Sequence, residues 1–249
     1  MSDKLVIIPT YNEKENIEDI IRRVLSLEKD FDILIIDDGS PDGTGDIVKR
    51  LIAEFDGRVF MEERTGKQGL GTAYIHGFKW ALEKNYQYIF EMDADFSHNP
   101  EDLVRLHDAC IDENADLVIG SRYISGVNVV NWPMGRVLMS YFASVYVRWI
   151  TGMKIMDATA GFKCYRAEVL KTIQIDKIKF VGYAFQIEMK FTTWKLGFKI
   201  LEIPIIFTDR TKGHSKMSGA IFKEAFQGVI GIKIKSWFID YKKMRQKTA

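Results

Sequence analysis

The stretch Ile89-Phe-Glu-Met-Asp-Ala-Asp-Phe-Ser-His-Asn-Pro100 joins a short apolar run to two carboxylates, Asp93 and Asp95, that are one residue apart. The run over residues 88–92 has the length and the β-rich character of a buried strand. In an open α/β sheet, ligands bind just beyond the carboxyl ends of the strands. Two carboxylates there supply the hard oxygen ligands that Mg²⁺ or Mn²⁺ requires, with water and a substrate diphosphate completing the shell. A solvated turn is the alternative, and on these residues alone it is favoured.

The composition indicates one folded unit that binds neither nucleic acid nor zinc. The chain has 249 residues, 47% of them hydrophobic, and a net charge of +1, which argues against disorder and against general nucleic-acid affinity. Cys110 and Cys164 form no CxxC pair, so a reducing compartment is expected. The first residues lack the apolar run of a signal peptide, and no run of about 18 uncharged apolar residues occurs. We therefore expect a soluble or peripheral cytosolic protein.

Apolar runs alternate with helical patterns along the first half of the chain, which predicts an α/β fold with a mostly parallel, Rossmann-like central sheet flanked by helices. No GxGxxG follows the first strand. Pro9 is expected to stop that strand, and Pro204 indicates an edge strand or a bulge. The strands are predicted at residues 5–8, 31–36, 58–61, 88–92, 117–119 and 199–207.

Acidic residues follow three of the predicted parallel strands: Glu13, then Asp37 and Asp38, then Asp93 and Asp95. The carboxyl ends of parallel strands lie at one edge, so these side chains should converge. Converging carboxylates repel one another unless a cation or hydrogen-bond donors offset them. The pattern therefore predicts a cleft for a nucleotide and a metal ion, in which Asp38 would bind a base or ribose. Pro9 and Tyr11 would form a wall beside the base, with ordinary strand termination as the alternative.

Four basic residues are candidates for binding phosphate: Arg122 at a strand exit, Arg136, and Arg210 and Lys216 in the Gly- and Ser-containing loop 208–218. Arginine matches phosphate in fork geometry, whereas lysine acts as a mobile point charge. Such a loop is able to close over a diphosphate. A solvated surface loop is an equally good interpretation, and the lone histidines, including His98, are more often incidental.

The last predicted helix, over residues 221–241, has aromatic and aliphatic residues on one face and lysines beside them, and a basic tail follows. This pattern fits a helix that lies in the headgroup region of a membrane. Packing onto the sheet is the alternative, and a membrane partner subunit is a third possibility. No linker separates the parts, so residues 1–219 and the C-terminal amphipathic helix and tail, 220–249, are expected to form one unit.

Together the motifs resemble family 2 glycosyltransferases with the GT-A fold, in particular the dolichyl- and polyprenyl-phosphate mannosyltransferases. The similarity extends in order over nearly the whole chain, and although Asp-Ala-Asp is a weak motif, the ordered set is specific. The motifs are Pro9-Thr-Tyr-Asn-Glu13, Asp37-Asp-Gly-Ser-Pro-Asp-Gly-Thr44, Gly69-Leu-Gly-Thr-Ala-Tyr-Ile-His-Gly77, Met92-Asp-Ala-Asp-Phe-Ser-His98, Gly120-Ser-Arg-Tyr123, Gly182-Tyr-Ala-Phe-Gln186, Asp209-Arg210 and Ser215-Lys216.

The resemblance implies a role for each matching position. Asp93 and Asp95 would hold Mg²⁺ or Mn²⁺, and Ala94 would line the sugar nucleotide. Some members place a metal-binding Gln where this chain has Ser97, whose hydroxyl is a weaker ligand. Catalysis would involve Asp95, Arg122, Arg210 and Lys216. The guanosine end of GDP-mannose would contact Pro9, Tyr11, Glu13, Ile36 and Asp38; the phosphates and sugar would contact Arg122, Arg210 and Lys216; and the lipid phosphate would contact Arg136 and Ser140.

The implied reaction is an inverting transfer of mannose from GDP-mannose to a polyprenyl or dolichyl phosphate, at the cytoplasmic face of a membrane. The acceptor phosphate is already an anion, so the reaction needs no protein general base. A different donor such as UDP-glucose is the nearest alternative, and a non-catalytic subunit that binds a nucleotide sugar is another. Some relatives carry C-terminal transmembrane helices that this chain lacks, which gives the amphipathic end more weight as a tether.

Overall fold

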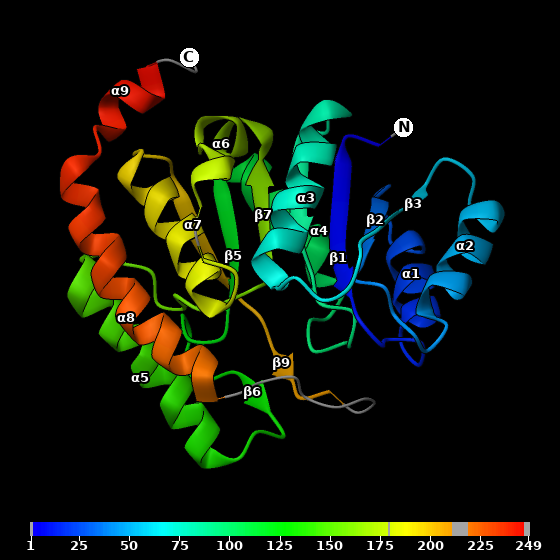
Figure 1. Ribbon diagram of the computed structural model, residues 1–249, viewed down its shortest axis with the longest axis horizontal. Coiled ribbons are helices and arrows are strands. Elements are labelled where there is room, and N and C mark those ends of the chain that lie inside the picture. Colours follow the sequence, from blue (N-terminus) through cyan, green and yellow to red (C-terminus); the bar gives the residue numbers. More distant parts are fainter. Residues whose placement is uncertain (1, 179, 211–218, 247–249) are drawn as a thin grey trace.

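A seven-stranded sheet runs through the middle of the computed structural model, which describes residues 2–178, 180–210 and 219–246 (Figure 1). The strand order is β3-β2-β1-β4-β7-β5-β8, and every pairing is parallel except those of β7, which is antiparallel to β4 and β5. The mostly parallel sheet is thus confirmed. The strands are β1 (Lys4–Thr10), β2 (Asp32–Asp37), β3 (Val59–Glu63), β4 (Tyr88–Glu91), β5 (Leu117–Ser121), β7 (Lys163–Arg166) and β8 (Ile200–Pro204).

Successive side chains of a strand point to opposite faces, so the apolar strands build two separate cores. Leu5 and Ile7 of β1 belong to one core, and Val6 and Ile8 belong to the other. Helices α1 (Ile17–Leu25), α2 (Thr44–Glu54) and α4 (Asp102–Asp112) cover the second core. The first core is covered by α3 (Leu70–Glu83), α5 (Met134–Thr151), α6 (Ala167–Thr172), α7 (Tyr183–Lys195) and α8 (Gly219–Lys235).

A second, smaller sheet pairs β6 (Val129–Val130) with β9 (Phe207–Thr208) beyond the carboxyl ends of the main strands. Neither short strand was predicted as a separate element. The predicted strand over residues 199–207 is in fact divided, because β8 ends at Pro204 before β9 begins. As Pro204 indicated, β8 is an edge strand of the main sheet.

Pro9 does not end the first strand as expected, because β1 continues to Thr10. The pairing of β1 with β4 ends at Ile7 and Glu91, whereas the pairing of β1 with β2 continues through Pro9 and Ile36. A proline is tolerated there because β1 has already lost one of its two neighbours, so the missing N–H leaves no bond to β4 unmade.

The C-terminal helix is present, but the single helix expected over residues 221–241 is wrong. After α8 the chain forms a short 3₁₀ helix, η2 (Ser236–Phe238), and then α9 (Tyr241–Gln246). Ile239 is extended between them, and the carboxylate of Asp240 accepts a hydrogen bond from the Lys243 N–H at 3.0 Å. This side-chain cap starts a new helix and sets its direction. Within the described residues, no helix combines the length and the apolarity needed to cross a bilayer.

The packing of α3 on β1 depends on Gly77, which gives the first prediction. A Cβ atom at this position would lie 2.7 Å from Cγ2 of Ile7, a distance that requires the strand or the helix to move. We expect Gly77→Ala to lower the free energy of unfolding by about 1–3 kcal/mol, as overpacked cores do. Urea denaturation measures the change.

Gly231→Ala is the matched control, because nothing lies within 4 Å of its Cβ position in α8. This change should be neutral or raise the free energy of unfolding by up to about 1 kcal/mol through helix propensity. Equal stabilities for the two variants would show that α3 does not pack on β1 as described.

Candidate active site

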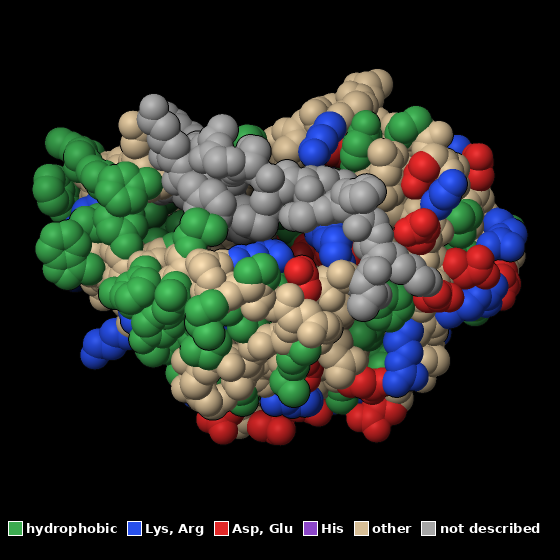
Figure 2. Space-filling view, turned by 90° about the horizontal axis from the view of Figure 1, so that it is seen from below, with side chains coloured by type: hydrophobic (Ala, Val, Ile, Leu, Met, Phe, Trp, Pro, Cys, Tyr) green, Lys and Arg blue, Asp and Glu red, His purple; other side chains and the backbone are tan. Residues whose placement is uncertain are grey.

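Glu13 and Asp95, two of the acidic residues predicted to converge, come together at the carboxyl edge of the sheet. Arg210 contacts both: its Nη2 lies 2.7 Å from Oδ2 of Asp95, and its Nη1 lies 4.0 Å from Oε1 of Glu13. Glu13 follows β1 and Asp95 follows β4, which are neighbouring parallel strands. Figure 2 views the molecule from this side and shows acidic and basic side chains together at a central hollow.

The small β6–β9 sheet brings Arg210 to this edge. The N–H of Thr208 in β9 donates to the carbonyl oxygen of Ser97 at 3.2 Å, and the N–H of Asp209 donates to Val130 of β6 at 3.0 Å. These bonds attach the end of β9 to the loop that carries the two aspartates. Arg210 is therefore positioned by backbone contacts between segments far apart in the sequence.

The two aspartates have different environments and opposite pKa shifts. Burial and the nearby charge of Asp95 raise the pKa of Asp93 to about 7. Burial acts in the same direction on Asp95, but the hydrogen bond from the Ser97 N–H at 3.0 Å and the charge of Arg210 outweigh it and lower the pKa of Asp95. The Asp95 side chain is 6% exposed, whereas that of Asp93 is 40% exposed, so Asp93 is only partly buried, and solvent moderates both the effect of burial on its pKa and its repulsion from Asp95.

This pair fits a divalent cation by its chemistry, because carboxylate oxygens are the hard ligands that such ions prefer. Among the residues that the structure describes, no group of three or more His, Cys, Asp or Glu side chains is placed to hold a metal ion. Water and substrate oxygens suit the remaining positions of a cation bound at Asp93 and Asp95.

His98, expected to be incidental, is buried beside the aspartates. Its ring stacks on Phe162 with centroids 4.7 Å apart and meets Phe207 of β9 edge-on at 5.4 Å. The N–H of Asp93 donates to its Nδ1 at 3.3 Å. Burial lowers the pKa of His98 to about 4, so the ring is neutral at physiological pH. These contacts suit His98 to shaping the aspartate loop.

Asp38, the candidate for a base or ribose, is held at the end of β2 by an arginine that the sequence interpretation missed. Nε of Arg64 donates to its Oδ1 at 2.7 Å, and the N–H of Gln68 donates to its Oδ2 at 3.4 Å. Tyr11 lies nearby, with Nζ of Lys67 5.6 Å from its ring centroid. The only sequence signal for Arg64 was its place at the start of a polar loop. Of the remaining candidates here, Pro9 is partly exposed, and Ala94 and Ile36 are buried.

Arg122 is fixed by Asp157, which was also missed. Nε and Nη2 of Arg122 each donate to one carboxylate oxygen of Asp157 at 2.7 Å, and Nη2 also donates to Thr159 at 2.8 Å. The guanidinium lies 5.5 Å from the ring centroids of both Trp132 and Phe207. Asp157 follows none of the predicted strands, and its partner lies 35 residues away, so no sequence signal marked it.

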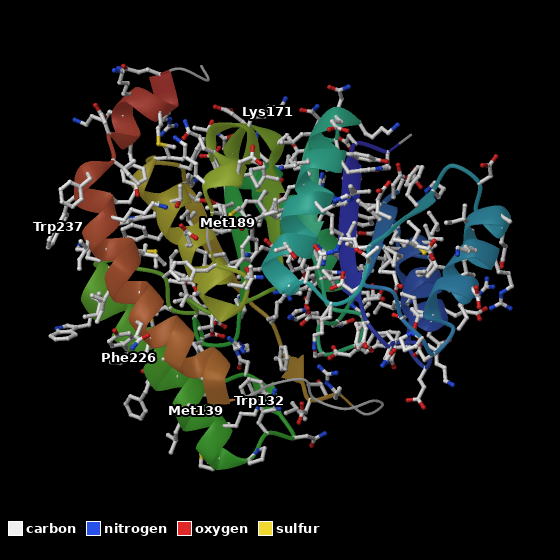
Figure 3. All side chains as sticks on the ribbon, in the orientation of Figure 1. Trp132, Met139, Lys171, Met189, Phe226 and Trp237 are labelled. Atoms are coloured by element: carbon white, nitrogen blue, oxygen red, sulfur yellow. The ribbon has the colours of Figure 1, made fainter. Side chains whose placement is uncertain are left out.

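Arg136 and Ser140 lie one helical turn apart on α5, near the same group of rings. Arg136 donates to Oδ1 of Asp209 at 3.0 Å and lies 4.1 Å from the ring centroid of Trp132, which Figure 3 labels beside the β6–β9 region. Because Asp209 adjoins Arg210, this pair connects the proposed lipid-phosphate position to the acidic cluster. Lys216 lies outside the described residues.

Comparison with known proteins identifies the family of this chain and two of its relatives. A family model described as glycosyl transferase family 2 matches residues 5–174. The chain is 47% identical over 235 residues to a polyprenol monophosphomannose synthase of Mycolicibacterium smegmatis, covering 94% of this chain and 86% of that protein. It is 48% identical over 225 residues to an undecaprenyl-phosphate mannosyltransferase of Micrococcus luteus, covering 90% and 91% of the two chains.

Solved structures resemble it in fold at low sequence identity. A glucosyl-3-phosphoglycerate synthase from Mycobacterium tuberculosis, in complex with Mn²⁺, UDP and its glucosyl product, matches with a TM-score of 0.64 and 19% identity over 92% of this chain and 79% of that chain. A mannosyltransferase from Pyrobaculum calidifontis, in complex with GDP-Man and Mn²⁺, matches with a TM-score of 0.57 and 14% identity over 99% and 73%.

Proposed function

Because this chain belongs to glycosyltransferase family 2, we propose that it transfers mannose from GDP-mannose to a polyprenyl phosphate of the dolichyl type and releases GDP. The resemblance found in the sequence is confirmed: the chain is a glycosyltransferase with the GT-A fold. The names of the two relatives support a polyprenyl phosphate acceptor and mannose as the sugar. GDP as the nucleotide and dependence on Mg²⁺ or Mn²⁺ are parts of the proposal.

The observation that carries the proposal is the contact of Arg210 with both Glu13 and Asp95 at the carboxyl edge. An arginine, whose guanidinium suits phosphate, lies directly beside a pair of carboxylates suited to a divalent ion. The negative charge of a diphosphate would be bound in two ways. Arg210 would bind it directly, and Asp93 with Asp95 would bind it through a divalent cation. Asp38 would bind the guanosine, which leaves the sugar between Ala94 and Arg122.

The chemistry is a single displacement at the anomeric carbon of mannose. An oxygen of the acceptor phosphate forms the new bond to this carbon while the bond to the β-phosphate of GDP breaks and its electron pair stays on GDP. A bound divalent ion would supply neutralisation of the charge that develops on the diphosphate. Arg210 adds to that neutralisation, while Arg122 and Arg136 hold the two phosphates in register. The acceptor is already anionic, so neutral His98 is not needed as a base.

We also propose that the enzyme works at a membrane surface, where its acceptor resides. Residues four or seven apart give α5 an exposed apolar stripe, and α8 with η2 has a second one beside it. The helices touch where Tyr146 stacks on Phe226 with ring centroids 4.4 Å apart. We call this surface the α5–α8 apolar face; it consists of Met134, Leu138, Phe142, Trp149, Phe226, Ile230, Ile234, Trp237 and Phe238.

The α5–α8 apolar face adjoins the proposed acceptor site. Figure 2 shows apolar side chains gathered over one end of the molecule, and in Figure 3 Trp237 points away from the ribbon. Trp149 is 81% exposed and Phe238 is 84% exposed, which is unusual for aromatic side chains unless they bind something. Arg136 lies on α5 within the same stretch of helix, so insertion of this face would bring it to the headgroup level.

Asp95→Asn tests the transfer reaction. We expect the turnover of mannosyl transfer from radiolabelled GDP-mannose to membrane-extracted polyprenyl phosphate, with Mn²⁺ or Mg²⁺ supplied, to fall by about 100-fold or more, because the change removes a charge that binds the cation and orients Arg210.

The matched control is Asp112→Asn, an exposed acid at the last turn of α4, which should leave the rate unchanged. If Asp95→Asn transfers mannose at the parent rate, the assignment of Asp95 is wrong. If the parent itself forms no mannosyl lipid, the proposed reaction is wrong.

Membrane binding is tested by placing charge on both stripes with the double change Phe142→Glu and Trp237→Glu. Each aromatic side chain contributes about 1.5–3 kcal/mol when it leaves water, so we expect sedimentation with anionic phospholipid vesicles to fall at least about tenfold. Ile111→Glu is the control, because this residue is 47% exposed on α4, against the other face of the sheet. Equal vesicle binding by the double variant and the control would contradict a role for this face.

A further inference from the structure

Helix α7 carries a fully buried lysine that no step of the proposed reaction uses. Lys190 is 0% exposed, and its Nζ donates to the carbonyl oxygens of Ala158 at 2.9 Å and Ala160 at 2.6 Å. A buried lysine is rare because removing the ammonium from water is costly. Burial lowers the pKa of Lys190 well below its usual range, yet a neutral amine still has two N–H donors for these two carbonyls. The hydrogen bonds therefore persist whether or not Lys190 carries a charge.

The segment that accepts the hydrogen bonds of Lys190, residues 158–160, directly follows Asp157, the partner of Arg122. From its other side, Glu202 of β8 accepts hydrogen bonds from the N–H groups of Met156 at 2.6 Å and Asp157 at 2.8 Å. Residues 156–160 are thus hydrogen-bonded to β8 on one side and to α7 on the other. Held in this way, the Asp157 carboxylate accepts from both Nε and Nη2 of Arg122 and fixes the plane of the guanidinium.

The same face of α7 also reaches the strand that carries the aspartates. Gln186, one turn before Lys190, donates to Oε2 of Glu91 at 2.7 Å, and Lys163 lies 3.0 Å from Oε1 of Glu91. Glu91 is the last residue of β4, two positions before Asp93. One helix face therefore supports both the strand before the carboxylate pair and the anchor of Arg122.

We propose that Lys190 is a positioning residue for mannosyl transfer, which holds residues 157–160 and, through Asp157, fixes the orientation of Arg122 toward the phosphates. The inference rests on the proposed function, because it assigns Arg122 a place in that reaction. Small displacements of a positioning group cost large factors in rate, since reacting groups must be held within a fraction of an ångström. Lys190 itself touches no substrate in this account.

The test is a double-mutant cycle between Lys190→Met and Arg122→Ala, measured as kcat/KM for GDP-mannose with a polyprenyl phosphate acceptor. In the parent background we expect Lys190→Met to lower kcat/KM about tenfold or more. In the Arg122→Ala background the same change should lower it less than about twofold, because the group that Lys190 positions is already gone. General damage to the fold would instead reduce both backgrounds by the same factor.

Thr193→Val is the matched control for burial. Thr193 is also 0% exposed on α7, but its hydroxyl donates to Met189 of its own helix, so this change should leave kcat/KM within twofold of the parent. If Lys190→Met does not fold, as judged by its melting curve, the same cycle is run with Lys190→Gln, whose shorter side chain does not reach both carbonyl oxygens, and the same non-additive result is expected.

Equal losses in both backgrounds, or no loss in the parent background, overturn the role of Lys190. Failure of the underlying reaction is distinguishable, because the parent enzyme would then form no mannosyl lipid in the same assay.

Discussion

Repulsion between carboxylates is the constraint on which this structure depends. Strands β1, β2 and β4 are parallel, so their carboxyl ends, and the acids that follow them, meet at one edge of the sheet. Three of these acids are offset by an arginine from a different segment: Arg210 contacts Glu13 and Asp95, and Arg64 contacts Asp38. The charge of the site is therefore partly compensated before any substrate arrives, and the raised pKa of Asp93 reflects the repulsion that is left. In our account, binding of a cation and a diphosphate exchanges these internal ion pairs for pairs with substrate.

The parts of this arrangement that local sequence determines were predictable. Short apolar runs placed β1, β2 and β4, and acids at their ends gave the edge at which Glu13, Asp38 and Asp95 lie. The arginine contacts were not predictable, because they depend on tertiary pairing. Arg210 reaches Asp95 because Thr208 donates a hydrogen bond to Ser97 and because β9 pairs with the two-residue strand β6. Neither of these two contacts has a sequence signature.

Residues of ordinary local appearance account for most of what sequence reasoning missed. Asp157 has no distinguishing neighbours in the sequence, yet the fold places it against Arg122. His98 is a lone loop histidine in the sequence, yet its ring stacks on Phe162. The break before α9 was missed for a related reason, because the periodic apolar pattern outweighed the capping potential of Asp240. In each case a polar side chain has a partner that lies far away in sequence or competes with a stronger local pattern.

We propose that this edge binds the diphosphate of a guanosine sugar nucleotide together with a divalent cation. Isothermal titration of the parent protein with GDP-mannose, with and without Mn²⁺, tests that claim most directly, and UDP-glucose serves as the comparison ligand. We expect Mn²⁺ to tighten the binding of GDP-mannose at least about tenfold and UDP-glucose to bind more weakly under the same conditions. Equal affinity for GDP-mannose with and without Mn²⁺, or tighter binding of UDP-glucose, would contradict it.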